Sequence, residues 1–444
     1  MDSKYFVPGK LWRSFGILSV ALVLGGLMAL SGCAKDEDTT DTTSKWDSAA
    51  NIVQTSDADY DNNTNGIITA ATLKTWIDDW ATNKPTGITG NLVIMSVSDG
   101  GTGREFLASG TGIKSYKVTT SGLVETRSNG VTETPSMVLS GAKMDLFLKL
   151  YGIDPSADMI VWVMGSATNG GPAMQAGRGW YLFRYWGVEK EHLALLNGAL
   201  AVHTTDLPDS YFTATADTAP DTGTFSVKSL SADNTALQAS LGEMFDVAQG
   251  KNLPSGGAFL WDARSAAEYN GDAAKTTGTT ATQGCGTGTN PPCIYVAFEG
   301  TIKGAVNLEY TNLLDATAGY AYKSKADIST LVTTLGYTSG ETVYTWCRTS
   351  YRAMVTMIAS NVILGNPAKV YDGAWIEWGQ LSTNPDKAGN PVMPSTSPWL
   401  TDVAALSDNI TKNTSANVEP LAVITNAAAA SADAIIVADK AYKN

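Results

Sequence analysis

Short runs of consecutive apolar residues alternate along this chain with longer segments whose apolar residues are spaced three or four apart. The runs have the length of buried strands, and the spaced segments have the period of amphipathic helices. We expect strands at 92–95, 159–164, 193–196, 258–261, 343–346 and 368–371. We expect helices near 70–80, 144–150, 176–186, 236–245, 328–335 and 353–364, and a last one within the Ala-rich segment 426–443. This alternation predicts an α/β protein with mostly parallel sheets flanked by helices.

The same succession of elements occurs twice, which predicts two tandem α/β domains. Residues 196–200 (Leu-Asn-Gly-Ala-Leu) parallel residues 371–375 (Tyr-Asp-Gly-Ala-Trp) in the second copy. We place the domains at 63–205 and 225–383, with a linker at 206–224 and a C-terminal extension at 384–444.

The N-terminus has the pattern of a targeting segment. Basic residues precede an apolar stretch at 15–30, and Leu30-Ser31-Gly32-Cys33 follows. This tetrapeptide resembles the bacterial lipobox, which implies removal of residues 1–32 as a signal peptide and lipidation of Cys33. The alternative is an uncleaved membrane anchor, for which the apolar stretch is short. Ala34 rather than Asp follows this cysteine, which by resemblance to the sorting pattern of enteric bacteria favours the outer membrane. We therefore expect a lipid-anchored, extracytoplasmic protein of the bacterial cell envelope.

The composition of the chain argues against some classes of binding partner. Residues 33–62 are acidic and Thr-rich, which predicts a tether between the membrane anchor and the folded domains. The formal net charge of −13 argues against nucleic-acid binding. With two histidines and no Cys/His cluster at metal-ligand spacing, we expect neither a zinc site nor a cofactor.

The four cysteines divide by role. Cys33 would carry lipid, and Cys285 and Cys293 lie in a Gly- and Pro-rich loop suited to a local disulfide, which leaves Cys347 unpaired. An alternative is that one cysteine of the pair resolves an oxidised Cys347.

Cys347 is the candidate nucleophile. It follows the apolar run 343–346 and precedes a polar loop and a helix. At such a strand end a thiol faces backbone N–H groups and the positive end of the helix dipole, and Arg348 and Arg352 add cations. These effects favour the thiolate, which is the nucleophilic form. The alternative is a small, buried core residue.

Four motifs in the second half resemble the rhodanese (thiosulfate/3-mercaptopyruvate sulfurtransferase) family and stand in the family's order. They cover about residues 225–382 and are Leu260-Trp-Asp262-Ala-Arg264-Ser-Ala-Ala-Glu268-Tyr269, Gly300-Thr-Ile-Lys-Gly-Ala-Val-Asn307, Cys347-Arg-Thr-Ser-Tyr-Arg352-Ala and Tyr371-Asp-Gly-Ala-Trp375-Ile-Glu377-Trp378. The resemblance implies a tandem architecture with a catalytic C-terminal copy. The N-terminal copy lacks the Asp-x-Arg element and has no cysteine near 164–165, so we expect it to be non-catalytic.

The resemblance also implies a mechanism. Cys347 would take the outer sulfur of an anionic donor such as thiosulfate as a persulfide and pass it to a thiol or cyanide acceptor. Arg264 would bind the sulfonate end of the donor, although an ion pair with Glu268 is the alternative. The loop N–H groups would form an anion-binding nest. The loop residues are Arg348, Thr349, Ser350, Tyr351 and Arg352, and the supporting residues are Asp262, Glu268, Asp372 and Trp375.

The chain departs from the family at three places. Gly-Thr-Ile-Lys-Gly-Ala replaces the usual Gly-His-Ile-Pro-Gly-Ala, Ser350 or its neighbour stands where many members have Gly, and an insertion at about 271–298 is expected to form a lid or rim. Two arginines in the loop favour thiosulfate over mercaptopyruvate. The alternatives are a sulfur or selenium carrier that works with a periplasmic redox partner, and a silent binding module.

Overall fold

The computed structural model describes residues 44–98, 103–270, 299–382, 384–385, 391–392, 399–402 and 433–444. All of these described residues belong to one compact unit. In the described residues, no helix is long and apolar enough to span a bilayer.

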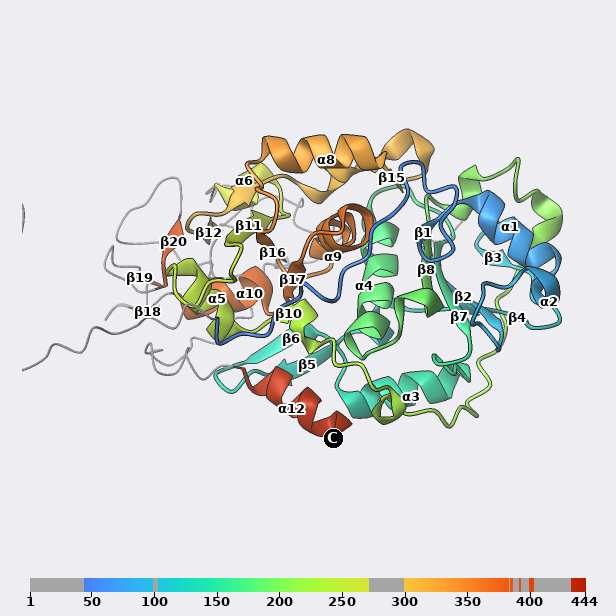
Figure 1. Ribbon diagram of the computed structural model, residues 1–444, viewed down its shortest axis with the longest axis horizontal. Coiled ribbons are helices and arrows are strands. Elements are labelled where there is room, and N and C mark those ends of the chain that lie inside the picture. The colour runs from blue at the N-terminus through green and yellow to red at the C-terminus, as the bar shows by residue number, and fades with distance from the viewer. Residues whose placement is uncertain are drawn as a thin grey trace, which may run out of the picture. The chain divides into compact units, whose positions relative to one another are not determined.

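The first half is built on a sheet of five parallel strands (Figure 1). In spatial order these are β1 (Gly66–Ile68), β8 (Leu193–Leu196), β7 (Met159–Met164), β2 (Leu92–Val97) and β4 (Ile113–Lys117). The helices of this half are α1 (Ala70–Asp78), α2 (Trp80–Asn83), α3 (Gly141–Tyr151) and α4 (Gly171–Tyr185).

The second half repeats this arrangement with a second sheet of five parallel strands. Its spatial order is β10 (Gln238–Ala239), β17 (Ala368–Tyr371), β16 (Thr342–Trp346), β11 (Ala258–Asp262) and β13 (Val306–Asn307). Its helices are α5 (Leu241–Ala248), α6 (Ala266–Tyr269), α8 (Lys325–Thr334), α9 (Ala353–Met357), the π-helix η9 (Ile358–Leu364) and α10 (Ala374–Leu381). In each sheet, the strand that comes first in the chain lies at one edge, next to the strand that comes last in the chain. The expected tandem α/β fold is therefore confirmed.

Shorter elements surround the sheets. The antiparallel pairs are β3 (Phe106–Leu107) with β9 (Phe212–Thr213), β5 (Glu125–Ser128) with β6 (Glu133–Met137), β12 (Thr301–Ile302) with β20 (Thr401–Asp402), β14 (Leu314–Asp315) with β15 (Ala321–Tyr322), and β18 (Asn384–Pro385) with β19 (Pro391–Val392). The 3₁₀ turns are η1 (Thr120–Leu123), η2 (Lys190–His192), η3 (Leu200–Val202), η4 (Asp209–Tyr211), η5 (Val227–Ser229), η6 (Thr235–Leu237), η7 (Tyr310–Leu313) and η8 (Ala316–Ala318). The last helix is α12 (Ala434–Lys443).

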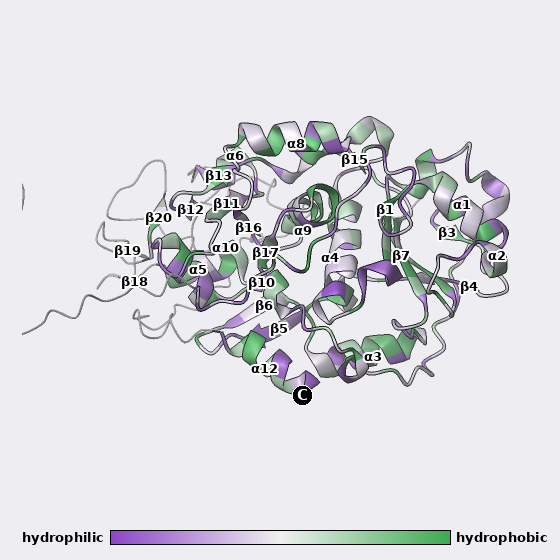
Figure 2. Cartoon of the chain, in the orientation of Figure 1, coloured by the Kyte–Doolittle hydropathy of each residue, from purple (hydrophilic) through white to green (hydrophobic). Residues whose placement is uncertain are grey.

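Local sequence explains the main elements. β7 is apolar throughout and buried at every position, as expected of a strand covered on both faces, and Figure 2 colours the strands around β1 and β7 as hydrophobic. α3 ends at Gly152, whose φ of 62° is left-handed and costs glycine little.

The two halves meet through helices α4 and α9, which pack side by side (Figure 1). Gly177 of α4 permits the close approach, because a Cβ there would lie 3.0 Å from the Cβ of Met354. α9 is the helix that follows the loop bearing Cys347, so the first half packs directly against the support of that loop.

Three expectations need correction. The helix expected at 236–245 starts only at Leu241, because residues 238–239 form the edge strand β10. The helix expected at 353–364 is confirmed in its bounds, and the correction concerns only its type, because the part from Ile358 onward is the π-helix η9. Residues 44–62, assigned above to a tether, pack against the second half: Gln54 N donates to Asn361 O and Ser56 N to Ile363 O.

The packing of residues 44–62 has a physical reason, because this segment carries apolar side chains. Ala49, Ile52 and Tyr60 are buried, and Tyr60 also donates its hydroxyl to Lys323 O at 2.6 Å. Their burial stabilises an ordered segment despite the acidic composition around them.

Candidate active site

Cys347 lies directly after β16, the central strand of the second sheet, and is a free thiol with 1% of its surface exposed. Its carbonyl accepts a hydrogen bond from Trp375 N at 2.9 Å, and Arg348 O accepts one from Ile376 N at 3.0 Å. The start of α10 therefore holds the backbone on both sides of the cysteine's peptide bond.

The loop that follows turns through a left-handed residue. Ser350 has a φ of 61°, and its hydroxyl lies 2.9 Å from Tyr371 O and 3.1 Å from Asp372 O. A non-glycine residue in this conformation is uncommon and is retained where its surroundings hold it. The departure from glycine is therefore accommodated by the fixed carbonyls at the end of β17.

The loop keeps backbone donors free for a ligand. Among the described residues, no protein acceptor receives the peptide N–H groups of Thr349, Ser350 and Tyr351. Successive unengaged N–H groups next to a sulfur nucleophile can bind an anion. The anion-binding nest expected from the sequence stays a prediction.

Arg264 is placed differently from the expectation. Its guanidinium is fully buried, with Nε 2.9 Å from Asp262 Oδ1 and one terminal nitrogen 2.9 Å from Glu299 Oε2. Its other terminal nitrogen donates to Asp262 Oδ2 and to Gly300 O. With its donors used in this way, Arg264 fits a structural role better than binding a sulfonate, and its acidic partners are Asp262 and Glu299 instead of Glu268.

The two loop arginines are also paired. Arg352 makes two contacts of 2.7 Å with Glu268, and Arg348 contacts both Glu268 and Glu299. Local folding positions Glu268, because it closes a capping box with Ser265 at the start of α6. Burial alone would raise the pKa of Glu268, but the hydrogen bond and charge of Arg352, and then the charge of Arg348, outweigh it and hold that pKa well below its usual value.

These side chains form one buried network of three arginines and three carboxylates, which we call the six-charge network. Its members are Asp262, Arg264, Glu268, Glu299, Arg348 and Arg352. The formal charges cancel, so the loop arginines do not provide the excess positive charge expected from sequence. Thr301, which stands where the family has histidine, joins the network by donating to Asp262 Oδ2 at 2.8 Å.

The remaining supporting residues lie near the loop. Trp375 places its ring 4.5 Å from the guanidinium carbon of Arg264, in cation–π geometry. Asp372 forms a fully buried ion pair with Arg178 of α4, in the first half. Arg178 was missed from the sequence, where its signal was a charged residue within an otherwise apolar helix face.

Tyr310 is a second residue that the sequence did not reveal. Burial is the main cause that raises the pKa of its phenol to about 12. The charge of Arg352 opposes this rise, and the charge of Cys347 adds to it. A Cβ at Gly170, in the first half, would lie 2.8 Å from the Tyr310 ring. The Tyr310 ring therefore packs against the first half.

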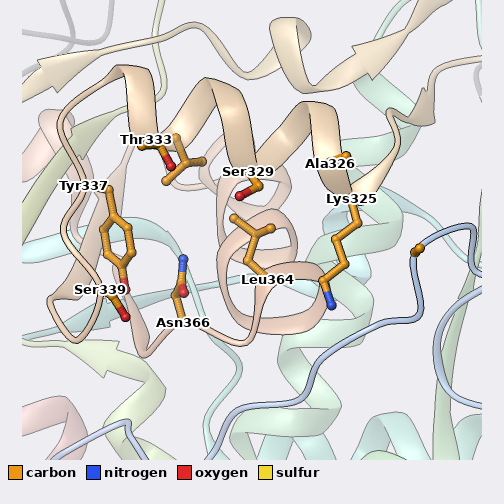
Figure 3. A pocket seen from close by; sticks show the side chains of 10 residues that line it. Lys325, Ala326, Ser329, Thr333, Tyr337, Ser339, Leu364 and Asn366 are labelled. Carbon is orange, nitrogen blue, oxygen red and sulfur yellow. The ribbon is translucent and has the colours of Figure 1, made fainter.

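The structure also contains a cavity away from the Cys347 loop. A cavity of about 710 Å³ opens beside α8 and is lined by polar side chains including Lys325, Ser329 and Thr333 (Figure 3). None of its lining residues belongs to the loop or to the six-charge network. Cys33, Cys285 and Cys293, with the predicted insertion at 271–298, lie outside the described residues.

The chain is similar in sequence to three proteins of known name. A thiosulfate sulfurtransferase of Azotobacter vinelandii is 32% identical over 127 residues, which are 28% of this chain and 38% of that protein. A thiosulfate sulfurtransferase of Pseudomonas aeruginosa is 31% identical over the same length, and the sulfur carrier protein TtuD of Thermus thermophilus is 31% identical over 83 residues, which are 18% of this chain and 28% of that protein. The chain thus matches well under half the length of these relatives.

The fold has a counterpart among solved structures. The structure of the EanB Y353A variant in complex with ergothioneine aligns with a TM-score of 0.51 at 17% identity, covering 71% of this chain and 68% of that one. No protein-family model matches the chain. The ordered motifs, the repeated parallel sheets and the similarity over 127 residues to two thiosulfate sulfurtransferases together support a rhodanese-type protein.

Proposed function

We propose that this protein is a sulfurtransferase that carries sulfane sulfur as a persulfide on Cys347. The observation that carries the proposal is the free thiol at the end of β16, next to three peptide N–H groups for which the described residues offer no acceptor. A thiolate there is positioned to attack a sulfur atom, and the N–H groups to stabilise the anionic product.

The reaction proceeds in two steps that balance. The Cys347 thiolate attacks the outer sulfur of thiosulfate, a new S–S bond forms, and sulfite leaves with the electron pair of the broken bond. A thiolate or cyanide acceptor then attacks the outer persulfide sulfur, and the Cys347 thiolate is released. Thiosulfate is the donor proposed from the sequence. Because the arginines are paired, its charge would be met by the loop N–H groups.

The test is mass spectrometry of the intact protein after exposure to thiosulfate and, separately, to 3-mercaptopyruvate. We expect wild type to gain one sulfur atom, to lose it on addition of cyanide with release of thiocyanate, and Cys347→Ser to gain none. An absence of sulfur on wild type with every donor would overturn the proposal, and a gain from 3-mercaptopyruvate alone would replace the donor.

A second candidate is a sulfur or selenium carrier that needs a protein partner for turnover, which the similarity to a sulfur carrier protein favours. The same experiment separates the two functions. A stable persulfide on wild type that cyanide and small thiols do not discharge would favour the carrier, whereas multiple turnover with a small acceptor would favour the enzyme.

We also propose that residues 1–33 direct the protein to the cell envelope as a lipoprotein. Membrane fractionation of the full chain and of Cys33→Ala tests this placement. Wild type is expected in the membrane fraction and the variant outside it, and equal distribution of both would contradict lipid anchoring.

A further inference from the structure

Arg178 connects the half without a cysteine to the loop that carries one. It lies on α4, is fully buried, and directs both terminal nitrogens at the carboxylate of Asp372, which is also fully buried. One of these nitrogens also donates to Ser136 O at 3.1 Å. The guanidinium thus joins the first half to the residue that follows β17.

Asp372 is positioned from two sides. Besides Arg178, its carboxylate accepts a hydrogen bond from Val138 N at 2.6 Å, so two separate segments of the first half fix this side chain. A buried carboxylate held by a guanidinium and a peptide N–H has little freedom to move. The backbone of Asp372 is consequently held where the first half places it.

The backbone next to this carboxylate is the support of the catalytic loop. The Ser350 hydroxyl contacts the carbonyls of Tyr371 and Asp372, and within the next residues Trp375 N bonds the carbonyl of Cys347. A displacement of Asp372 would therefore reach both the left-handed turn at Ser350 and the peptide that carries Cys347.

A second contact leads from the same arginine to the loop. The Arg178 guanidinium carbon lies 5.9 Å from the centre of the Tyr351 ring, and Tyr351 donates its hydroxyl to Thr120 O of η1, at 2.9 Å. Both ends of the turn formed by residues 350 and 351 thus depend on groups of the first half.

We propose that Arg178 is a positioning residue for sulfur transfer, which acts through Asp372 and Ser350 to fix the turn that presents Cys347. This inference rests on the proposed function for its rate measurement. It assigns to the first half a role in the reaction itself, because a misplacement of about 1 Å at a reacting group can cost about 100-fold in rate.

The experiment compares Arg178→Met and Arg178→Lys with Arg184→Met, all in the full chain. Arg184 is the matched control, because it is buried on the same helix but donates to Val188 O at the end of α4. We expect Arg178→Met to slow single-turnover persulfide formation about 100-fold while the KM for thiosulfate changes less than about threefold. Arg178→Lys should recover part of the rate, and Arg184→Met should keep it.

The path through Ser350 is tested with a double variant. If Arg178 acts through the turn, Arg178→Met combined with Ser350→Gly should be no slower than the slower single variant, because both break one connection. Fully additive losses, or equal losses in Arg178→Met and Arg184→Met, would overturn the proposal.

Alkylation of Cys347 by iodoacetamide provides a readout that does not need sulfur transfer. We expect the alkylation rate to change in Arg178→Met and to stay at the wild-type value in Arg184→Met. If wild type formed no persulfide, the proposed function would fail, while this difference would still support positioning by Arg178. Identical alkylation rates in all variants would refute it.

Discussion

The loops at 165–170 and 347–352 occupy equivalent places in the two halves and differ in almost every chemical respect. Each follows the central strand of its sheet, β7 or β16, and each precedes a helix at the interface, α4 or α9. Gly165 stands at the position of Cys347. The described residues show the six-charge network only around the second loop.

The two copies contribute different groups to the surroundings of Cys347. The second copy holds Cys347, the proposed nucleophile, and the six-charge network around it. The first copy holds groups that support that site, including Arg178 against Asp372, and Asn129 and Thr134, which both donate to the buried carboxylate of Glu377 on α10. Side chains of the first copy therefore reach the residues that support the second loop.

The largest effect is expected when the residues that follow β16 and β7, Cys347 and Gly165, are exchanged. We expect Cys347→Ser to lower sulfur transfer by at least about 1,000-fold, and Gly165→Cys in that background to restore none of it. A side chain at 165 would meet the backbone of Glu105, with a Cβ 2.9 Å from its Cα. A thiocyanate assay measures both variants, and activity regained in the double variant would contradict the assignment.

Glu268→Gln removes a carboxylate from the network of the second half. We expect a loss of about 3–5 kcal/mol in the free energy of unfolding, because Arg348 and Arg352 lose the negative charge that compensates them in a buried site. Urea denaturation at neutral pH measures it. The control is Asp209→Asn in the first half, whose exposed ion pair with Arg104 should contribute less than about 1 kcal/mol.

For Glu268→Gln we also expect a changed dependence of the free energy of unfolding on pH. Because the folded-state pKa of Glu268 lies below its ordinary value of 4.5, the ionised group stabilises the fold fully above that pH. This stabilisation is lost as the pH falls through the folded-state pKa. The Gln variant should therefore lose less stability than wild type on acidification below 4.5, and equal losses would argue against the pairing.

Asp439→Asn tests the attachment of the C-terminal helix to the first half. Asp439 accepts two hydrogen bonds from Arg127 and one from Tyr185, all within 2.8 Å. We expect a destabilisation of about 2 kcal/mol, measured by thermal and urea unfolding, because the charge of a buried hydrogen-bonded pair is lost. Lys440→Gln, one position along the helix, should change stability by less than about 1 kcal/mol.

The smallest effect is expected at the turn itself. Ser350→Gly relieves a left-handed φ but loses the hydroxyl contacts, so the two contributions of about 1 kcal/mol each should nearly cancel. Ser350→Ala loses the contacts and keeps the strain. We expect the Ala variant to unfold at lower urea concentration than the Gly variant, and the reverse order would show that φ at 350 does not limit stability.

Sequence reasoning succeeded where a segment carries its own signal. The apolar run 159–164 coincides with β7, and the run 343–346 lies within β16, because strands buried on both faces need no alternation. The edge strands β1 and β10 were missed, since three and two residues give no period to detect.

The site was predicted less completely, for a physical reason. Cys347 and its loop follow from a local pattern, but the role of Arg264 depends on Glu299, which is separated from it by the insertion. The same holds for Arg178, whose partner lies 194 positions away. Charge compensation between distant segments cannot be read from either segment alone.

The crossing of the chain ends has a consequence for dissection of the protein. Residues 44–60 lie on the second half, through Trp46 to Asp246 and Tyr60 to Lys323. α12 bonds the first half through Asp439 and Tyr442 and also contacts η5 and η6 at the start of the second. A gene cut at the linker would give two fragments. Each fragment would carry a terminal segment that packs on the other fragment. We expect such fragments to be insoluble when expressed singly and to reassemble when expressed together, so that this tandem repeat behaves as an interlocked pair instead of two separable modules.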